Sequence, residues 1–137
     1  MYPLFETLCI ENGKIQNIDL HQARYERSLR AYYGKSAVKI FNLFSLIQLP
    51  APLQNRLVRC RIDYNAKTTQ IQYFEYHRKI YRTFQPVICD DIEYGLKYSD
   101  RSLINTLFAQ RGACDEIIII KNGKVTDCSI GNLIFRQ

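Results

Sequence analysis

The chain of 137 residues contains 47% hydrophobic and 23% charged residues and has a formal net charge of +6. This composition is typical of a folded globular protein and excludes a disordered tail or a fibre. No apolar stretch approaches the roughly 20 residues that span a bilayer, and the first residues lack a basic-then-apolar export signal. We therefore expect a cytoplasmic protein without a membrane partner.

The positive charge is concentrated in one part of the sequence. Residues 1–85 carry a net charge of +7, whereas residues 86–137 carry −1. An uneven distribution of this kind favours an anionic partner for the first part, such as nucleic acid, a membrane surface or a phosphorylated small molecule. An evenly solvated basic surface is the simpler interpretation of the same charges.

The cysteines and histidines give no pattern typical of a metal site. The five cysteines are widely spaced and form no C-x-x-C pair, and the chain has only two histidines. We expect reduced thiols, most of them in the core, and no bound metal. The cysteines are Cys9, Cys60, Cys89, Cys114 and Cys128.

The first elements in chain order are a hairpin and two helices. Residues 4–10 and 14–18 flank an Asn-Gly pair, which is the strongest two-residue hairpin signal. Asp19 occupies an N-cap position, so we predict a helix over residues 20–33 that ends at Gly34. The apolar residues of 37–48, followed by two prolines, predict a second, buried helix.

A second hairpin and a boundary follow. Residues 56–64 and 69–76 alternate with the period of two that is typical of strands. The pattern is lost over residues 77–85, where the charge balance also changes sign. We therefore predict an N-terminal α+β domain over residues 1–82 and a second domain over residues 83–137.

The second domain is predicted to be rich in strands. We expect a strand over 87–94, a helix capped by Ser99 that runs through residue 109, an Asn-Gly hairpin formed by 116–120 and 124–126, and a last strand over 132–135. A short apolar strand so near the end lacks the neighbours that would bury it. The fold class is therefore α+β: a sandwich-like N-terminal domain with antiparallel hairpins and two helices, then an incomplete β-rich domain.

Two residues stand where chemistry could occur. Lys97 lies at a predicted junction between a strand and a helix, where a side chain can project into a cleft. Asp127 precedes a turn of small residues, 128–132, whose backbone can approach a ligand closely. Taken singly, a lysine is most often a solvated surface charge and an aspartate before a turn is most often structural.

The order and spacing of these features resemble the class IV family of pyridoxal-phosphate enzymes. That family contains branched-chain and D-amino-acid aminotransferases and 4-amino-4-deoxychorismate lyase. Its signature has an acidic residue, a small-residue turn and an Asn-apolar-Phe strand about thirty residues after a lysine, and Asp127 follows Lys97 by 30 residues. Phe5-Glu6-Thr7 and the spacing of His21 and Arg24 are similar to the family's N-terminal segments.

The resemblance implies a role for each matching residue. Lys97 would form the Schiff base with pyridoxal 5'-phosphate and carry the proton. Asp127 would face the pyridine nitrogen, and Arg24 would bind the cofactor phosphate. Ser129 and Ile130 would line the cofactor. The resemblance also implies a homodimer, a small amine or amino-acid substrate, and a second domain of the class IV aminotransferase type.

Three features depart from the family's pattern. Asp127 stands where the family usually has Glu, and Ser102 stands where its aminotransferases often have Tyr, which favours the lyase over the transaminase interpretation. The family also continues well beyond the strand predicted at 132–135. The sequence therefore leaves open a C-terminally truncated enzyme, of the aminotransferase or lyase type, and a non-catalytic family member with an incomplete cofactor site.

A single-stranded nucleic-acid-binding module is the alternative from another class. Basic and aromatic residues interleave over residues 56–84, as a stacking platform requires. Alternating strands would also produce this pattern, with aromatics packing and arginines facing water. Because no known RNA-binding motif supports the alternative, the sequence favours the enzyme.

Overall fold

The computed structural model describes all residues, 1–137. The chain divides into two compact units. Unit 1 comprises Met1–Arg78 together with Gly95–Ser99, and unit 2 comprises Lys79–Tyr94 together with Asp100–Gln137. The domain division predicted at residue 82 stays a prediction, and the short segment Gly95–Ser99, which carries Lys97, packs with unit 1.

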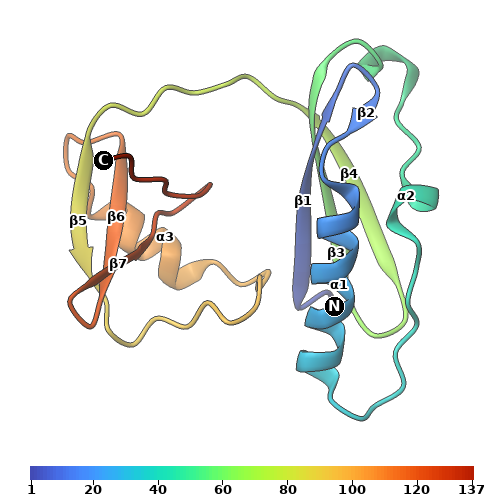
Figure 1. The fold of residues 1–137 in the computed structure, drawn as a ribbon, viewed down its shortest axis with the longest axis horizontal. Coiled ribbons are helices and arrows are strands. Elements are labelled where there is room, and N and C mark those ends of the chain that lie inside the picture. The colour runs from blue at the N-terminus through green and yellow to red at the C-terminus, as the bar shows by residue number, and fades with distance from the viewer. The chain divides into compact units, whose positions relative to one another are not determined.

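Unit 1 is built on a four-stranded antiparallel sheet with strand order β2-β1-β3-β4 (Figure 1). Its strands are β1 (Leu4–Glu11), β2 (Lys14–Ile15), β3 (Leu57–Tyr64) and β4 (Thr69–Glu75). Both residues of the Asn-Gly turn that joins β1 to β2 have a positive φ, as the predicted two-residue hairpin requires.

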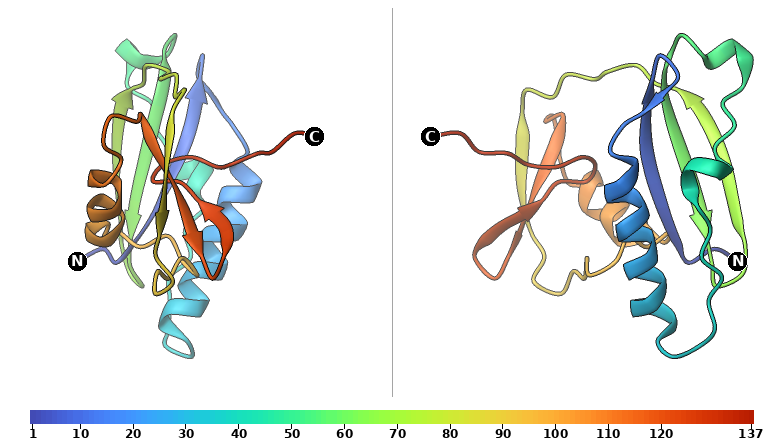
Figure 2. Two further views of the ribbon diagram at one scale, coloured as in Figure 1. Left: turned by 90° about the vertical axis from the view of Figure 1, so that its left-hand side faces the viewer. Right: turned by 45° about the vertical axis from the view of Figure 1, so that its right-hand side comes forward.

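Helix α1 (Ile18–Tyr33) and the segment that carries the short helix α2 (Leu43–Leu46) lie against one face of this sheet (Figure 2). Their buried side chains join those of β1 and β3 in one core, because alternate residues of each strand point to the same face. This core comprises Leu4, Leu8, Ile10, Tyr25, Leu29, Leu43, Val58, Cys60, Ile62 and Tyr64.

The second predicted helix is mostly wrong. Of residues 37–48 only the four of α2 are helical, and a 3₁₀ turn, Ala51–Leu53, follows. The preceding residues include β-branched and aromatic side chains, which favour extended backbone, and their N–H groups bond outside the segment. Lys39 N donates to Ala66 O at 2.7 Å, and Leu43 N donates to Gln22 Oε1 at 2.9 Å.

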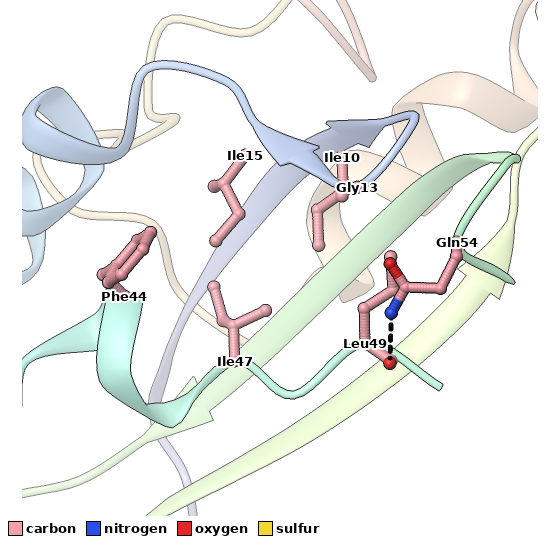
Figure 3. A pocket seen from close by; sticks show the side chains of 7 residues that line it. All are labelled: Ile10, Gly13, Ile15, Phe44, Ile47, Leu49 and Gln54. Atoms are coloured by element: carbon pink, nitrogen blue, oxygen red, sulfur yellow. Dashed lines mark hydrogen bonds between the residues drawn. The ribbon is translucent and has the colours of Figure 1, made fainter. Parts of the chain in front are cut away.

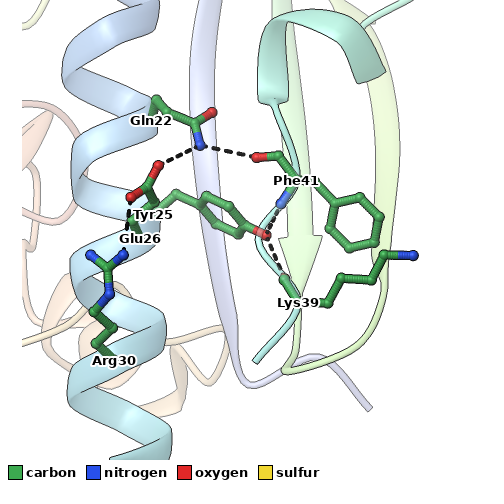
Figure 4. A network of polar contacts seen from close by, with 6 residues as sticks. All are labelled: Gln22, Tyr25, Glu26, Arg30, Lys39 and Phe41. Atoms are coloured by element: carbon green, nitrogen blue, oxygen red, sulfur yellow. Dashed lines mark hydrogen bonds and ion pairs between the residues drawn. The ribbon is translucent and has the colours of Figure 1, made fainter. Parts of the chain in front are cut away.

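A polar network fastens this extended segment to α1 (Figure 4). Phe41 N donates to the Tyr25 hydroxyl at 3.3 Å, and Gln22 Nε2 donates to Phe41 O at 3.0 Å. These bonds satisfy backbone groups that a helix would otherwise pair internally. Two side chains of α1, Gln22 and Tyr25, thus help to fix the backbone conformation of Phe41, which lies 19 and 16 residues later in the chain.

Helix α1 was predicted correctly except at its beginning. It starts at Ile18 after Asn17, which has φ 53° and provides no side-chain cap. Asp19 is therefore not the N-cap but lies in the first turn, where a carboxylate interacts favourably with the helix dipole. Gly34 ends the helix with a positive φ of 60°, as predicted.

Unit 2 contains a three-stranded sheet with order β5-β6-β7 and the helix α3 (Ser102–Ala109). Its strands are β5 (Phe84–Ile88), β6 (Glu116–Lys121) and β7 (Lys124–Asp127). Strands β6 and β7 form the predicted Asn-Gly hairpin, whereas β5 pairs with β6 in parallel, an arrangement that needs a long connection.

Three predicted elements around unit 2 differ from the structure. Strand β5 begins three residues earlier than predicted, and residues 89–94 lie outside any strand. Helix α3 has Arg101 rather than Ser99 at its N-cap, because the Ser99 backbone bonds to Pro3 in unit 1. Residues 132–135 form no strand, since no neighbouring strand pairs with them.

The α+β class of the fold is confirmed. No helix of the chain is long and apolar enough to span a bilayer. All five cysteines are free thiols, but only Cys60 and Cys128 are buried, so the predicted burial of most of them is wrong. Burial raises the pKa of the Cys60 thiol to about 12, which makes it a packing group rather than a nucleophile.

The substitution Ile62→Ala tests the core of unit 1. The Ile62 side chain is fully buried on β3, so its truncation should lower the free energy of unfolding by about 2–5 kcal/mol. Denaturant titration followed by circular dichroism measures the change. Ile80→Ala is the matched control, because Ile80 is 77% exposed and its loss should cost less than about 0.5 kcal/mol.

Candidate functional site

The candidate site of unit 1 depends on two consecutive residues of β1. Phe5 and Glu6 point to opposite faces of the sheet, as successive strand residues do. Glu6 shares the face of the core residues Leu4 and Leu8, beneath α1, and Phe5 lies on the other face. Each of these two side chains holds a cation that the sequence singled out.

Lys97 lies against Phe5. Its segment extends the sheet along the part of β1 that β2 does not reach, with a bridge between Leu4 and Tyr98. Phe5 N donates to Lys97 O at 3.1 Å, and Ser99 N donates to Pro3 O at 2.8 Å. The Lys97 Nζ lies 4.7 Å from the centroid of the Phe5 ring, a favourable cation–π distance.

A second cation contacts the same aromatic ring. The Arg61 guanidinium carbon lies 4.2 Å from the Phe5 centroid. Asp63 fixes this guanidinium by accepting from its Nε at 2.8 Å and its Nη2 at 2.7 Å, and these bonds raise the pKa of Arg61. Because Asp63 offsets the charge of Arg61, the positive charge of Lys97 remains beside the Phe5 ring, a setting that suits an anionic ligand there.

Glu6 is a carboxylate with no exposed surface. It accepts hydrogen bonds from Arg24 Nε at 2.8 Å, Arg24 Nη2 at 2.5 Å and, with the ring protonated at that nitrogen, His21 Nδ1 at 2.7 Å. Burial alone would raise the pKa of Glu6, but the bonds from His21 and Arg24 outweigh it, and the pKa lies below its usual value. Glu6 is thus a buried anion held between two residues of α1.

Arg24 is held on one edge and exposed on the other. Its Nε and Nη2 bind Glu6, and this pairing raises the pKa of Arg24. The side chain is nevertheless 42% exposed, and its Nη1 makes no hydrogen bond within the chain. The family resemblance implies that Arg24 binds the cofactor phosphate, and the free edge of the guanidinium has the chemistry for that role.

Unit 2 holds the remaining predicted residues on one short stretch. Asp127 ends β7 and is half-buried, and its Oδ1 accepts from Cys128 N at 2.9 Å. Burial, together with the charge of Asp127, raises the pKa of the Tyr94 hydroxyl to about 12. The second carboxylate oxygen of Asp127 makes no hydrogen bond within the chain, so it can accept a proton donor from a ligand.

Ser129 is held by a buried carboxylate that the sequence analysis missed. Its hydroxyl donates to Glu116 Oε2 at 2.7 Å, and its N–H donates to Glu116 Oε1 at 3.3 Å. Arg101 donates to Ser129 O from the other side. Glu116 is only 2% exposed, and Ile130 is 52% exposed. The Ser129 hydroxyl therefore helps to fix the conformation of the turn, and Ile130 presents apolar surface beside it.

One signal in the sequence could have identified Glu116. It directly precedes four isoleucines at the start of a buried strand, where an acidic residue is costly unless it is paired. The same reasoning applies to Glu6, which shares the alternation of Leu4 and Leu8. In both cases an acidic residue at a core position indicates that a hydrogen-bond donor lies nearby and pairs with the carboxylate.

The five predicted residues thus form two groups. Strand β1 brings Lys97 and Arg24 to consecutive residues of unit 1, and the segment after β7 brings together Asp127, Ser129 and Ile130 in unit 2. No group of three or more histidine, cysteine or acidic side chains could hold a metal ion.

A pocket of about 260 Å³ lies at the other end of β1, near the hairpin turn (Figure 3). None of the five predicted residues lines it, and its polar lining is limited to Gln54, whose side chain donates to Leu49 O. We therefore do not assign the chemistry to this pocket. It is lined by Ile10, Gly13, Ile15, Phe44, Ile47, Leu49 and Gln54.

Comparison with known proteins places the chain in a family. A Haemophilus influenzae protein of unassigned function is 93% identical over 137 residues, which make up 100% of this chain and 73% of that protein. A crystal structure from Haemophilus somnus 129pt, named a putative 4-amino-4-deoxychorismate lyase, is 54% identical and has a TM-score of 0.95. The alignment covers 100% of this chain and 72% of that one, and the chain therefore belongs to the family of these lyase-like proteins.

More distant structures share the fold. Two proteins that carry the same putative lyase name, one of them from Legionella pneumophila, align with TM-scores of 0.72 and 0.69 at 16% identity. The alignments cover 93% of this chain and 57% and 56% of those chains. No family model matches the chain.

The lowered pKa of Glu6 predicts how stability depends on pH. A carboxyl group with a depressed folded-state pKa stabilises the fold above its unfolded value of about 4.5, and this stability is lost as the pH falls through the folded value. Glu6→Gln should therefore lower the free energy of unfolding at pH 7 by about 1–3 kcal/mol and flatten its decline below pH 4.5.

Urea unfolding between pH 3 and pH 7 measures this dependence. Glu75→Gln is the control, because that carboxylate is 42% exposed and lies 3.7 Å from Arg56. It should change neither the stability nor its slope appreciably. An unchanged acid slope in Glu6→Gln would show that Glu6 is not the group that titrates.

Proposed function

We propose that this chain is part of a pyridoxal-phosphate-dependent lyase that acts on an amine of the 4-amino-4-deoxychorismate type. The observation that supports it most is the guanidinium of Arg24, which the buried Glu6 holds by one edge while the side chain stays 42% exposed. The family of the chain supports the choice of a lyase. The presence of Ser102, where aminotransferases of the resembled class often have Tyr, favours the same choice.

The donor set fits pyridoxal phosphate. An aldehyde needs a primary amine, a phosphate needs a guanidinium with a free edge, and a ring N–H needs a carboxylate oxygen. Lys97, Arg24 and Asp127 supply these three groups, and the last two each keep one atom without a partner in the chain. The aspartate is one methylene shorter than the glutamate usual in the resembled class, so the backbone or the ring would have to shift for the carboxylate to reach the ring nitrogen.

Lys97 would transfer the proton that leaves the carbon next to the substrate amine. When bound, pyridoxal phosphate supplies an electron-withdrawing ring that stabilises negative charge at the carbon next to the substrate amine. Lys97 Nζ would anchor the cofactor, accept the proton from that carbon and return a proton to the departing pyruvate. The positive charge of Lys97 beside the Phe5 ring favours an anionic substrate such as a carboxylic acid.

Asp127 and Arg24 would orient the cofactor. The free Oδ2 of Asp127 would hold the proton on the ring nitrogen, while its Oδ1 stays bonded to Cys128 N. The Nη1 edge of Arg24 would bind the phosphate, and Ile130 would offer apolar surface to the ring. A homodimer, in which the partner subunit adds substrate contacts, belongs to the same proposal.

The test is to trap the cofactor on its lysine. After addition of pyridoxal phosphate, an absorbance band in the visible region should appear, and borohydride followed by peptide mapping should label Lys97. Lys97→Ala should lose the band and at least about 10³-fold of the lyase rate, since both the anchor and the proton carrier are removed.

Lys35→Ala is the matched control, because Lys35 is exposed and just beyond α1. It should keep the band and the rate. Labelling spread over surface lysines, with no preference for Lys97, would contradict the proposal and favour a non-catalytic member of the family. A salt-dependent complex with a single-stranded oligonucleotide would instead support the binding module.

A further inference from the structure

The arrangement of Glu6 and Arg24 differs from that of an ordinary surface ion pair. Glu6 has no exposed surface, whereas the Arg24 side chain is 42% exposed. The carboxylate of the pair is therefore buried, and one edge of the guanidinium is accessible to solvent. A buried ion pair contributes little net stability, because desolvation of the charges offsets their attraction. Stability alone is therefore a weak reason for a carboxylate at this core position.

The geometry restrains the orientation of the guanidinium. Glu6 Oε1 accepts from Nε, and Oε2 accepts from Nη2, which is the two-bond arrangement that fixes both planes relative to each other. His21 Nδ1 contacts the same Oε2 at 2.7 Å and restrains rotation of the carboxylate. Glu6 itself lies on β1, one residue from the Phe5 that carries Lys97.

The remaining edge of Arg24 is the part left for a ligand. Its Nη1 has no partner in the chain, and a guanidinium with one fixed edge loses little entropy when an oxyanion binds the other. We propose that Glu6 is a positioning residue, which with His21 holds Arg24 so that its Nη1 edge binds the phosphate of the cofactor. This inference rests on the proposed function.

Two physical effects of Glu6 on a bound phosphate oppose each other. Orientation of the guanidinium strengthens binding, whereas the negative charge of Glu6 weakens it. The charge lies on the far edge of the guanidinium from the anion, and Arg24 itself stands between them. Orientation is therefore the larger effect, and removal of Glu6 should weaken phosphate binding.

The experiment measures the part of the affinity that is due to phosphate. The dissociation constants of pyridoxal phosphate and of pyridoxal, which lacks the phosphate, are measured by calorimetry on the purified protein. The dissociation constant of pyridoxal divided by that of pyridoxal phosphate is the ratio compared among variants. Glu6→Gln should reduce this ratio about tenfold, which corresponds to loss of one charge-assisted contact. Arg24→Ala should reduce it at least as much.

Further variants separate orientation from charge. Glu6→Asp keeps the charge but cannot reach both nitrogens, so it should also reduce the ratio. In the Arg24→Ala background, Glu6→Gln should have no further effect, because Glu6 acts only through Arg24. Glu26→Gln is the matched control on α1, where Glu26 pairs with Arg30, and it should leave the ratio unchanged. Circular dichroism confirms that each variant is folded.

The outcomes distinguish this inference from the proposed function. If Arg24→Ala lowers the ratio and Glu6→Gln and Glu6→Asp do not, the positioning role is wrong and the phosphate site stands. If Glu6→Gln tightens phosphate binding, the main effect of Glu6 is to offset the positive charge of Arg24, and the inference is overturned. If neither residue affects the ratio, and inorganic phosphate does not protect Arg24 from phenylglyoxal, Arg24 is not the phosphate ligand and the assignment beneath both proposals fails.

Discussion

The alternation of side chains along β1 is the constraint on which the candidate site depends. Because consecutive residues of a strand point to opposite faces, Phe5 and Glu6 separate two cations that come from distant parts of the chain. The lysine arrives on a segment that follows unit 2 residues in sequence but pairs with the edge of β1. The arginine arrives on α1, which is anchored to the sheet by the buried core.

Buried carboxylates at the starts of strands have a similar role in both units. Glu6 fixes the guanidinium of Arg24, and Glu116 fixes the hydroxyl and the N–H of Ser129. In each case an inaccessible acidic group satisfies its hydrogen bonds with a residue at the surface. An acidic side chain in a core is costly unless all its acceptors are used, so these contacts are specific in their geometry.

Local signals in the sequence predicted the local elements. The Asn-Gly pairs defined two of the three hairpins, and Gly34 defined the end of α1, because these features depend on neighbouring residues. Residues 37–48 were misread as a helix since their backbone groups bond to α1 and to Ala66, contacts that no local pattern contains. The parallel pairing of β5 and the return of Lys97 to unit 1 are likewise tertiary features. The resemblance to the class IV family singled out Lys97, Arg24 and Asp127, but not the carboxylates Glu6 and Glu116 that hold Arg24 and Ser129.

The most direct test of this account is a crystal structure of the protein after borohydride reduction in the presence of pyridoxal phosphate. We expect electron density joined to Lys97 Nζ, with phosphate oxygens at the Nη1 edge of Arg24 while its other edge remains on Glu6. Density joined to another lysine, or a phosphate bound away from Arg24, would contradict the claim that β1 organises the cofactor site.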